Sequence, residues 1–277
     1  MMMSTIAPPQ YIAPPGIDPH RFGIFSVAAM PEPSGRWELG VEWEPLTGDR
    51  AALRSHETCP DDYAEDVELR AGETVDQATP FLVVGSYLCK SASRPLDEAR
   101  ERAQLHLTGG EERAVEYAIA TGAMGNDPTL AGATDLTPTA GTPVSLADGV
   151  ALIEAHYTAE HHSPVTIHAP AILGVGLEVG RVARRQGQRL ETLLGSFVSA
   201  GGGYPNEDPT GTPAAAGEAW LYGTGRPTIR RSEVFVDQPD DHLIELSTND
   251  VAIMAQRAYL VSWDGPTVAV LVDAPGA

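Results

Sequence analysis

Apolar and polar side chains alternate in a segment near the N-terminus. In residues 37–43 every second position is Trp, Leu or Val, and the positions between them are Glu or Gly. This two-residue period is typical of a strand with one buried face. Residues 81–89 are rich in Val, Leu, Phe and Tyr and predict a second strand. Residues 45–78 hold few large apolar side chains, so we expect residues 37–90 to form a long hairpin. The solvated segment between its two strands would be only marginally stable on its own.

The next segments have the spacing of helices. Apolar residues recur every three or four positions over residues 94–107, which predicts a helix with Pro95 near its first turn. A capping sequence at residues 108–111 predicts a second helix that ends at Gly122. Because residues 109 and 110 are both glycine, we expect a kink or break between the two helices.

A second helical region follows a loop rich in Gly, Asn and Asp. Residues 145–148 are another capping sequence, and the apolar stripe after them predicts an amphipathic helix that stops by Pro164. Residues 165–168 predict a short buried strand. A further helix is expected over residues 170–182, with the adjacent Arg184 and Arg185 toward its C-terminal end.

The last third of the chain favours strands. Segments rich in β-branched and aromatic residues occupy positions 220–225, 228–229, 233–236, 251–255, 259–263 and 268–272. Before them, the Gly-rich residues 201–205 predict the start of a mobile loop. Helices concentrate in the middle of the chain and strands toward its end, so the predicted fold class is α+β.

Prolines dominate the first 20 residues. Proline lacks a backbone N–H, so this segment favours extended conformations, and we expect an arm that a neighbouring molecule orders. No segment has the apolar length of a membrane span, and the start lacks the basic and apolar regions of a signal peptide. We therefore expect no membrane association and a protein that is cytoplasmic when made.

The charge balance excludes one class of function. The chain has 38 acidic and 18 basic residues, a formal net charge of −20. Proteins that read DNA sequence need basic surfaces, so sequence-specific DNA binding is not expected. An acidic inner wall that repels a packed genome is compatible with this charge, as is an acidic enzyme.

Candidate catalytic and metal-binding residues are few. Four histidines fall within thirteen positions, namely His156, His161, His162 and His168. Their spacing does not match a zinc motif, residues 195–197 lack the final glycine of a serine nucleophile elbow, and the Gly-rich segments lack the lysine of a phosphate loop. We predict no catalytic, cofactor-binding or metal-binding residues, and no enzyme.

Two pairs of residues leave alternatives open. Cys59 and Cys89 are either free thiols or a disulfide formed after the protein leaves a reducing cell. Arg226 and Arg257 stand beside predicted strands, either as surface residues of a sheet or as contacts to acidic patches of an adjacent subunit.

The order of these segments resembles that of tailed-bacteriophage major capsid proteins of the Hong Kong 97 type, whose fold encapsulin shells share. Residues 120–128 resemble the Gly-rich segment after the long helix of that family, and residues 165–170 resemble its strand and proline turn. Residues 194–198 are similar to the strand before the loop at the local symmetry axis. Similarity to the closing part of the fold extends over residues 220–236, 249–263 and 268–272.

The resemblance implies a division of the chain. It assigns residues 1–36 to an N-terminal arm, residues 37–90 to an E-loop hairpin and residues 91–122 to the spine helix region. The P and A domains share residues 123–277 discontinuously, with the A domain at roughly 145–225. The arm, the hairpin and the loop at residues 201–212 are expected to contact neighbouring subunits.

The resemblance also implies the function of a major capsid protein. Such a protein self-assembles through hexamers and pentamers into an icosahedral head shell, the virion capsid, which is built in the host cytoplasm and encloses double-stranded DNA without sequence-specific binding. Scaffolding, portal and decoration proteins are the implied partners. Some family members join subunits through a Lys–Asn bond, but the single lysine here, Lys90, lies at the foot of the hairpin, so we do not expect this cross-link.

Other functions remain open from the sequence. An encapsulin-like compartment shell would be distinguished by cargo genes beside its own gene, and a minor virion protein by its copy number. A soluble hydrolase or ligand-binding protein would be a monomer with a deep pocket.

Overall fold

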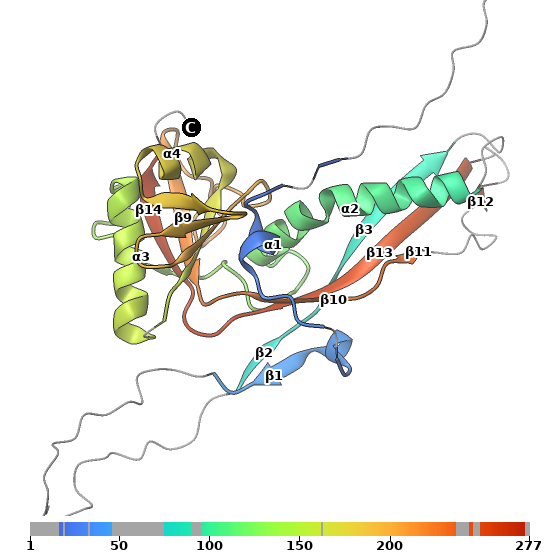
Figure 1. The fold of residues 1–277 in the computed structure, drawn as a ribbon, viewed down its shortest axis with the longest axis horizontal. Helices are drawn as coiled ribbons and strands as arrows, with labels where there is room; N and C mark the ends of the chain where they lie inside the picture. The colour runs from blue at the N-terminus through green and yellow to red at the C-terminus, as the bar shows by residue number, and fades with distance from the viewer. Residues whose placement is uncertain are drawn as a thin grey trace, which may run out of the picture.

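The chain folds into two layered parts that lie side by side (Figure 1). This computed structural model describes residues 17–18, 20–32, 34–45, 75–89, 96–161, 163–236, 244–245 and 250–274. The first 16 residues, the tip of the expected hairpin, Cys59, Lys90, His162 and the side chain of Cys89 lie outside the described residues. The expectations about a disulfide and about the lysine therefore stay predictions.

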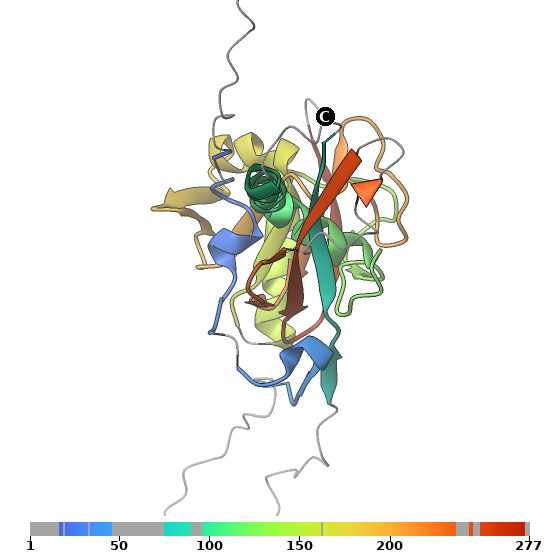
Figure 2. The same cartoon turned by 90° about the vertical axis from the view of Figure 1, so that its right-hand side faces the viewer.

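The first part is a long helix on an antiparallel sheet. The helix α2 (Leu96–Thr121) has 26 residues, a length of about 39 Å. The central strand of the sheet is β13 (Asp250–Ser262), and four other strands pair with it. These are β3 (Phe81–Cys89), β10 (Thr228–Arg231), β11 (Phe235–Val236) and β12 (Ile244–Glu245). In Figure 2 the helix is seen end-on and lies to one side of β3 and β13.

The helix and β3 approach each other closely at a glycine. Phe81 and Val83 of β3 are buried beneath α2. At Gly85 a Cβ atom would stand 2.3 Å from the backbone nitrogen of Leu107 in α2. Only glycine leaves room for this backbone contact, so Gly85 sets the distance between helix and sheet.

The predicted break at Gly109 and Gly110 is wrong, because α2 continues through both residues. Glycine inside a helix costs about 1 kcal/mol relative to alanine. Burial on both sides of the glycines offsets this cost, since Leu107 and Val115 are almost completely buried against the sheet. Packing therefore overrides the local preference.

The second part is a seven-stranded mixed sheet with the helix α3 (Leu146–Glu160) packed against it. The strand order is β4-β14-β9-β5-β8-β7-β6. The bounds are β4 (Thr134–Asp135), β5 (Thr166–Pro170), β6 (Ala183–Gln186), β7 (Arg189–Thr192), β8 (Phe197–Gly201), β9 (Glu218–Thr224) and β14 (Val268–Asp273). Ile153 and Tyr157 of α3 pack on Ile167, Leu221 and Val270 of the sheet in a core separate from that under α2.

The predicted start of α3 is confirmed. The Ser145 hydroxyl accepts a hydrogen bond of 3.2 Å from the backbone N–H of Asp148, as in an N-cap. The strands expected near residues 165–168, 220–225, 228–229, 233–236 and 268–272 are confirmed as β5, β9, β10, β11 and β14. The two segments at 251–255 and 259–263 belong to one continuous strand, β13.

The helix predicted over residues 170–182 is wrong in its length. A 3-10 turn, η3 (Ala171–Leu173), leads into α4 (Gly174–Val179), and the chain then enters β6. The three glycines of this stretch weaken the helix, and Arg181 takes a left-handed conformation with φ of 57° that ends it. Arg184 and Arg185 therefore lie on a strand and not at the end of a helix.

The predicted pairing of residues 37–43 with residues 81–89 is also wrong. Residues Trp37–Leu39 form a 3-10 turn, η1, and only β1 (Val41–Trp43) is a strand, which pairs with β2 (Asp76–Ala78). The second predicted leg is β3, which pairs with β13 over nine residues. Pairing with β13 gives β3 a longer ladder of hydrogen bonds, and α2 covers one face of this pair.

Part of the predicted arm packs on the chain's own body. Residues 24–27 form a short helix, α1 (Ile24–Val27), whose Ile24 and Val27 are fully buried. Ala29 forms a bridge with Thr228 at the start of β10. The expectation that the chain before residue 37 is a free arm is therefore wrong for this part, because its apolar side chains reach the core between the two sheets.

The loop after β8 is not the mobile loop that its glycines predict. Gly201, Gly203 and Tyr204 are buried against α2. Asp208 accepts hydrogen bonds of 2.8 Å from the backbone N–H groups of Thr210 and Thr212, which holds the following turn. Side-chain contacts from both parts of the molecule thus fix a segment that composition alone marks as irregular.

Candidate assembly surfaces

One face of the β3–β13 sheet is apolar and uncovered within the described part of the chain. Side chains alternate along β3, so Phe81 and Val83 face α2 and the residues between them face away. The outward residues Leu82, Val84 and Leu88 are 57%, 50% and 61% exposed. Large apolar residues at this exposure, all on one face, are typical of a contact surface.

The neighbouring strands extend this face. The register pairs Val84 with Gln256 of β13, and Gln256 in turn with Phe235 of β11, so Phe235 and Val84 point to the same side. Met254 lies two residues from Gln256 and also points outward. We call this surface the apolar sheet face, defined by Leu82, Val84, Leu88, Phe235 and Met254. Its residues come from three neighbouring strands, β3, β13 and β11.

The opposite face is held to α2 by a buried ion pair. Glu111 of α2 accepts hydrogen bonds from Arg257 Nη1 at 2.9 Å and from the Tyr259 hydroxyl at 2.7 Å. Arg231 of β10 lies 3.7 Å from the other carboxylate oxygen. Arg257 is therefore not a free surface arginine, because Glu111 of α2 neutralises its charge.

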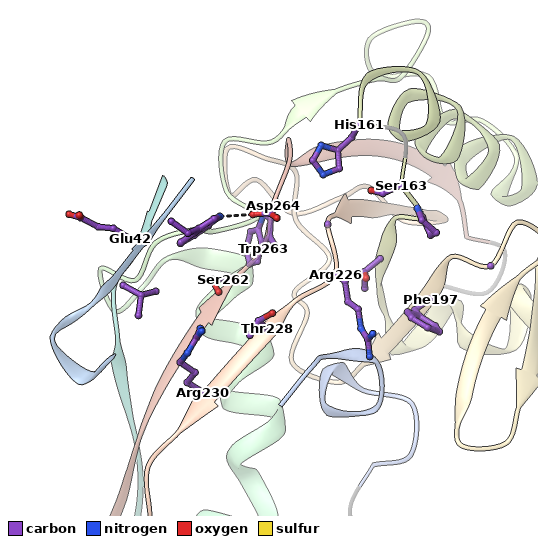
Figure 3. A pocket seen from close by; sticks show the side chains of 16 residues that line it. Glu42, His161, Ser163, Phe197, Arg226, Thr228, Arg230, Ser262, Trp263 and Asp264 are labelled. Atoms are coloured by element: carbon purple, nitrogen blue, oxygen red, sulfur yellow. Dashed lines mark hydrogen bonds between the residues drawn. The ribbon is translucent and has the colours of Figure 1, made fainter. Parts of the chain in front are cut away.

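A cavity lies where β1 meets the two sheets (Figure 3). Its volume is about 640 Å³, and its wall includes Trp43, Trp263, Asp264, Arg226 and Arg230. The Trp43 indole donates a hydrogen bond of 2.5 Å to Asp264, which ties β1 to the end of β13. The Arg226 guanidinium lies 5.3 Å from the centre of the Phe197 ring and donates to the backbone carbonyl of Val27.

The wall of this cavity combines tryptophans, arginines and small polar residues. In Figure 3 Arg226 lies beside Thr228, Arg230 lies below Ser262 and His161 stands at the top of the view. Among the described residues, neither arginine forms an ion pair with a carboxylate. In the described part of the chain, no serine of the wall makes a hydrogen bond to His161.

Two of the four clustered histidines, His161 and His168, are buried. His168 is completely buried, with Nδ1 3.0 Å from the Tyr204 hydroxyl and Nε2 2.8 Å from the Thr224 hydroxyl, and burial lowers its pKa to about 3. His161 is buried with its ring edge against Tyr157. Within the described ranges, no three metal-ligating side chains are grouped closely enough to hold an ion. None of the described helices has the length and apolar character of a membrane span.

Sequence reasoning missed the two features that organise these surfaces. The outward alternation of Leu82, Val84 and Leu88 is legible in the sequence, but an apolar run of this kind is equally typical of a strand buried on both faces. No local sequence pattern predicts the Glu111–Arg257 pair, because 146 residues separate the two residues.

No family model matches the chain, and no curated protein matches it.

Solved structures match it over almost its whole length. The capsid of a native GTA particle has a TM-score of 0.56 at 12% identity, covering 97% of this chain and 96% of that one. The capsid of Ralstonia phage GP4 has a TM-score of 0.52 at 12% identity, with coverages of 97% and 95%. The SrpI encapsulin of Synechococcus elongatus PCC 7942 has a TM-score of 0.53 at 12% identity, with coverages of 97% and 92%.

At this identity the similarity concerns the fold. The matches cover nearly the whole of each chain, so the shared fold includes both parts of the molecule. The α+β class expected from the sequence is therefore confirmed, and the chain has the Hong Kong 97-like fold of capsid and encapsulin shell subunits.

Proposed function

We propose that this protein is the major capsid protein of a tailed bacteriophage, which self-assembles into the icosahedral head shell around the phage genome. The observation that carries the proposal is the end-to-end match to capsid subunits, with 97% of this chain and 96% of the GTA capsid chain superposed. Fold alone does not determine function, but this fold is matched here in both capsid and encapsulin shell proteins. The role is structural, without catalysis.

The apolar sheet face supports assembly. Val84 and Phe235 would remain in water in a solitary subunit, at a cost of about 25 cal/mol for each Å² of apolar surface. A neighbouring copy that covers this face removes the cost. Closed shells are built from such repeated contacts between different patches of identical subunits, here arranged as hexamers and pentamers.

We assign the parts of the fold to their roles by the same reasoning. Residues 91–122 are the spine helix region, residues 123–277 supply the P and A domains, and the A domain takes in roughly residues 145–225. Residues 1–36 and 37–90 are the arm and the E-loop, with the qualification that α1 and β3 pack on their own body. The free parts of both would reach adjacent subunits.

The remaining partners follow from the proposed role. A scaffolding protein would guide assembly in the host cytoplasm, and portal and decoration proteins would complete the shell. The packaged double-stranded DNA would be held without sequence-specific contacts, consistent with a net charge of −20.

An encapsulin-like compartment is the second candidate. The match to the SrpI encapsulin, with a TM-score of 0.53, favours it as strongly as the phage GP4 capsid favours the first candidate. The two differ in what they enclose. Terminase and portal genes beside the gene would indicate a virus, and a cargo enzyme gene would indicate a compartment.

Electron microscopy of the expressed protein tests the proposal. Together with the proteins of neighbouring genes, the full chain is expected to form closed shells of uniform diameter. A variant that lacks residues 1–16 keeps every described residue and is expected to remain folded but to lose shell yield. The proposal would be contradicted if the full chain stayed monomeric at every concentration, whether or not the proteins of neighbouring genes were present.

A further inference from the structure

A buried carboxylate joins three separate segments of the chain. Glu116 of α2 is only 1% exposed. Its Oε1 accepts a hydrogen bond of 3.0 Å from the backbone N–H of Ile24 in α1, and its Oε2 accepts one of 2.8 Å from the N–H of Gly203 in the loop after β8. One turn earlier, Glu112 accepts a bond of 2.9 Å from the N–H of Phe25.

Glycines make the space that this carboxylate occupies. A Cβ atom at Gly201 would lie 2.1 Å from the Glu116 carboxyl carbon, and one at Gly23 would lie 2.6 Å from Oε1. At Gly203 a Cβ would meet the backbone oxygen of Arg113 at 2.1 Å. Because three residues from two segments are glycine, the Glu116 side chain fits between these segments, and any larger residue at the three positions would collide with α2.

The loop that Glu116 holds is also fixed from the other side. The Tyr204 hydroxyl lies 2.8 Å from the Ser199 hydroxyl and 3.0 Å from Nδ1 of His168, both in the seven-stranded sheet. Glu116 therefore connects the α2 part of the molecule to the second part, and at the same time holds the N-terminal segment.

The charged groups around Glu116 do not neutralise it fully. On its own helix Glu112 opposes its charge and Arg113 favours it. From the loop it faces the buried phenol of Tyr204. From the N-terminal segment His20 acts on Glu112, and Arg21 and Arg185 of β6 line the small cavity beside that residue.

We propose that Glu116 is a proton-dependent clasp, which holds the N-terminal segment and the loop at residues 201–204 against α2 more tightly when its carboxyl group is protonated. Removal from water disfavours the charged form, and the two N–H donors do not compensate for it fully. The clasp is a property of the single subunit, so it holds whether or not the subunit builds a shell.

The sign of the pH dependence follows from linkage. Burial raises the pKa of Glu116 to about 7 in the closed clasp, whereas a solvated glutamate has a pKa near 4.5. Between these values the closed state binds more protons than the open state, so closure weakens as pH rises. From pH 6 to pH 8 the closing equilibrium is expected to fall by about tenfold.

Hydrogen exchange measured by mass spectrometry on the unassembled full chain tests the clasp. After correction for the intrinsic exchange rate, protection of peptides that cover residues 22–27 and 201–206 is expected to fall about tenfold between pH 6 and pH 8. The variant Glu116→Gln removes the titrating group and is expected to abolish this pH dependence. Glu101→Gln, at an exposed position of the same helix, is the matched control and should behave as the wild type.

Two results would overturn the clasp. One is protection of these peptides in the wild type that does not change with pH, and the other is an unchanged pH dependence in Glu116→Gln. Should that variant fail to fold, the carboxyl ¹³C shift of Glu116 in the wild type decides the matter. A titration midpoint near 7 supports the clasp, and one near 4.5 refutes it.

Discussion

Glu111 of α2 accepts a hydrogen bond of 2.9 Å from the guanidinium of Arg257 in β13, although 146 residues separate the two in the sequence. Both side chains are largely buried, with exposures of 11% and 14%. The same carboxylate oxygen also accepts from Tyr259, so one side chain holds the middle of the helix to the central strand. Charge-assisted bonds of this kind are about twice as strong as neutral ones.

Removing this carboxylate should destabilise the subunit. Glu111→Ala leaves the Arg257 charge buried without a partner, so we expect the free energy of unfolding to fall by about 3 kcal/mol. Urea denaturation measures the change. Arg100→Ala breaks the exposed pair with Asp97 on the same helix, and a loss below about 1 kcal/mol is expected there. Equal losses in the two variants would show that the buried pair has no special role.

Two glycines near α2 should respond oppositely to alanine. At Gly85 a methyl group would meet the backbone of Leu107 at 2.3 Å, and we expect Gly85→Ala to cost about 3 kcal/mol or more because helix and sheet must separate. At Gly110 no atom lies within 4 Å, so Gly110→Ala should stabilise the helix by about 0.5–1 kcal/mol. Thermal unfolding of both variants checks the contrast. A stable Gly85→Ala protein would show that the contact is not tight.

A charge on the apolar sheet face should block assembly without unfolding the subunit. Val84 is 50% exposed at the centre of this face, so Val84→Lys is expected to change the free energy of unfolding by less than about 1 kcal/mol. Shell yield, counted by electron microscopy, is expected to fall to background because a lysine would be desolvated at the contact. Val84→Thr keeps the β-branched shape and should retain shells. Normal shells from Val84→Lys would exclude this face as a contact.

The buried His168 should make the subunit sensitive to acid. Its pKa is lowered by burial to about 3, whereas an unfolded histidine titrates near 6.5. Between these values the unfolded state binds more protons, so stability falls as pH falls. His168→Gln should reduce this slope by about 1.4 kcal/mol per pH unit.

Urea denaturation at several pH values between 4 and 7 measures that slope. His106→Gln, at an exposed position of α2, leaves the network of His168 with Tyr204 and Thr224 intact and is the control for the loss of a histidine. If His168→Gln kept the wild-type slope, some other group would be the source of the acid sensitivity.

Features that local chemistry controls could be predicted from the sequence. Ser145 caps α3 because its hydroxyl reaches the N–H of Asp148, three residues away. The strands β5, β9 and β14 form where β-branched and aromatic residues cluster. Even at 12% identity to solved capsids the order of elements was legible, because a fold depends on which elements follow one another more than on any single residue.

Features that depend on contacts between residues far apart in the chain could not be predicted from the sequence. Gly109 and Gly110 predict a break, but burial of Leu107 and Val115 on the sheet carries the helix through them. The partner of β3 is β13 and not β1, since a nine-residue ladder covered by α2 buries more than an isolated hairpin does. The sites of Glu111 and Glu116 exist only when segments from opposite ends of the chain meet, and a buried carboxylate acquires its energetic role from those partners rather than from its neighbours in sequence.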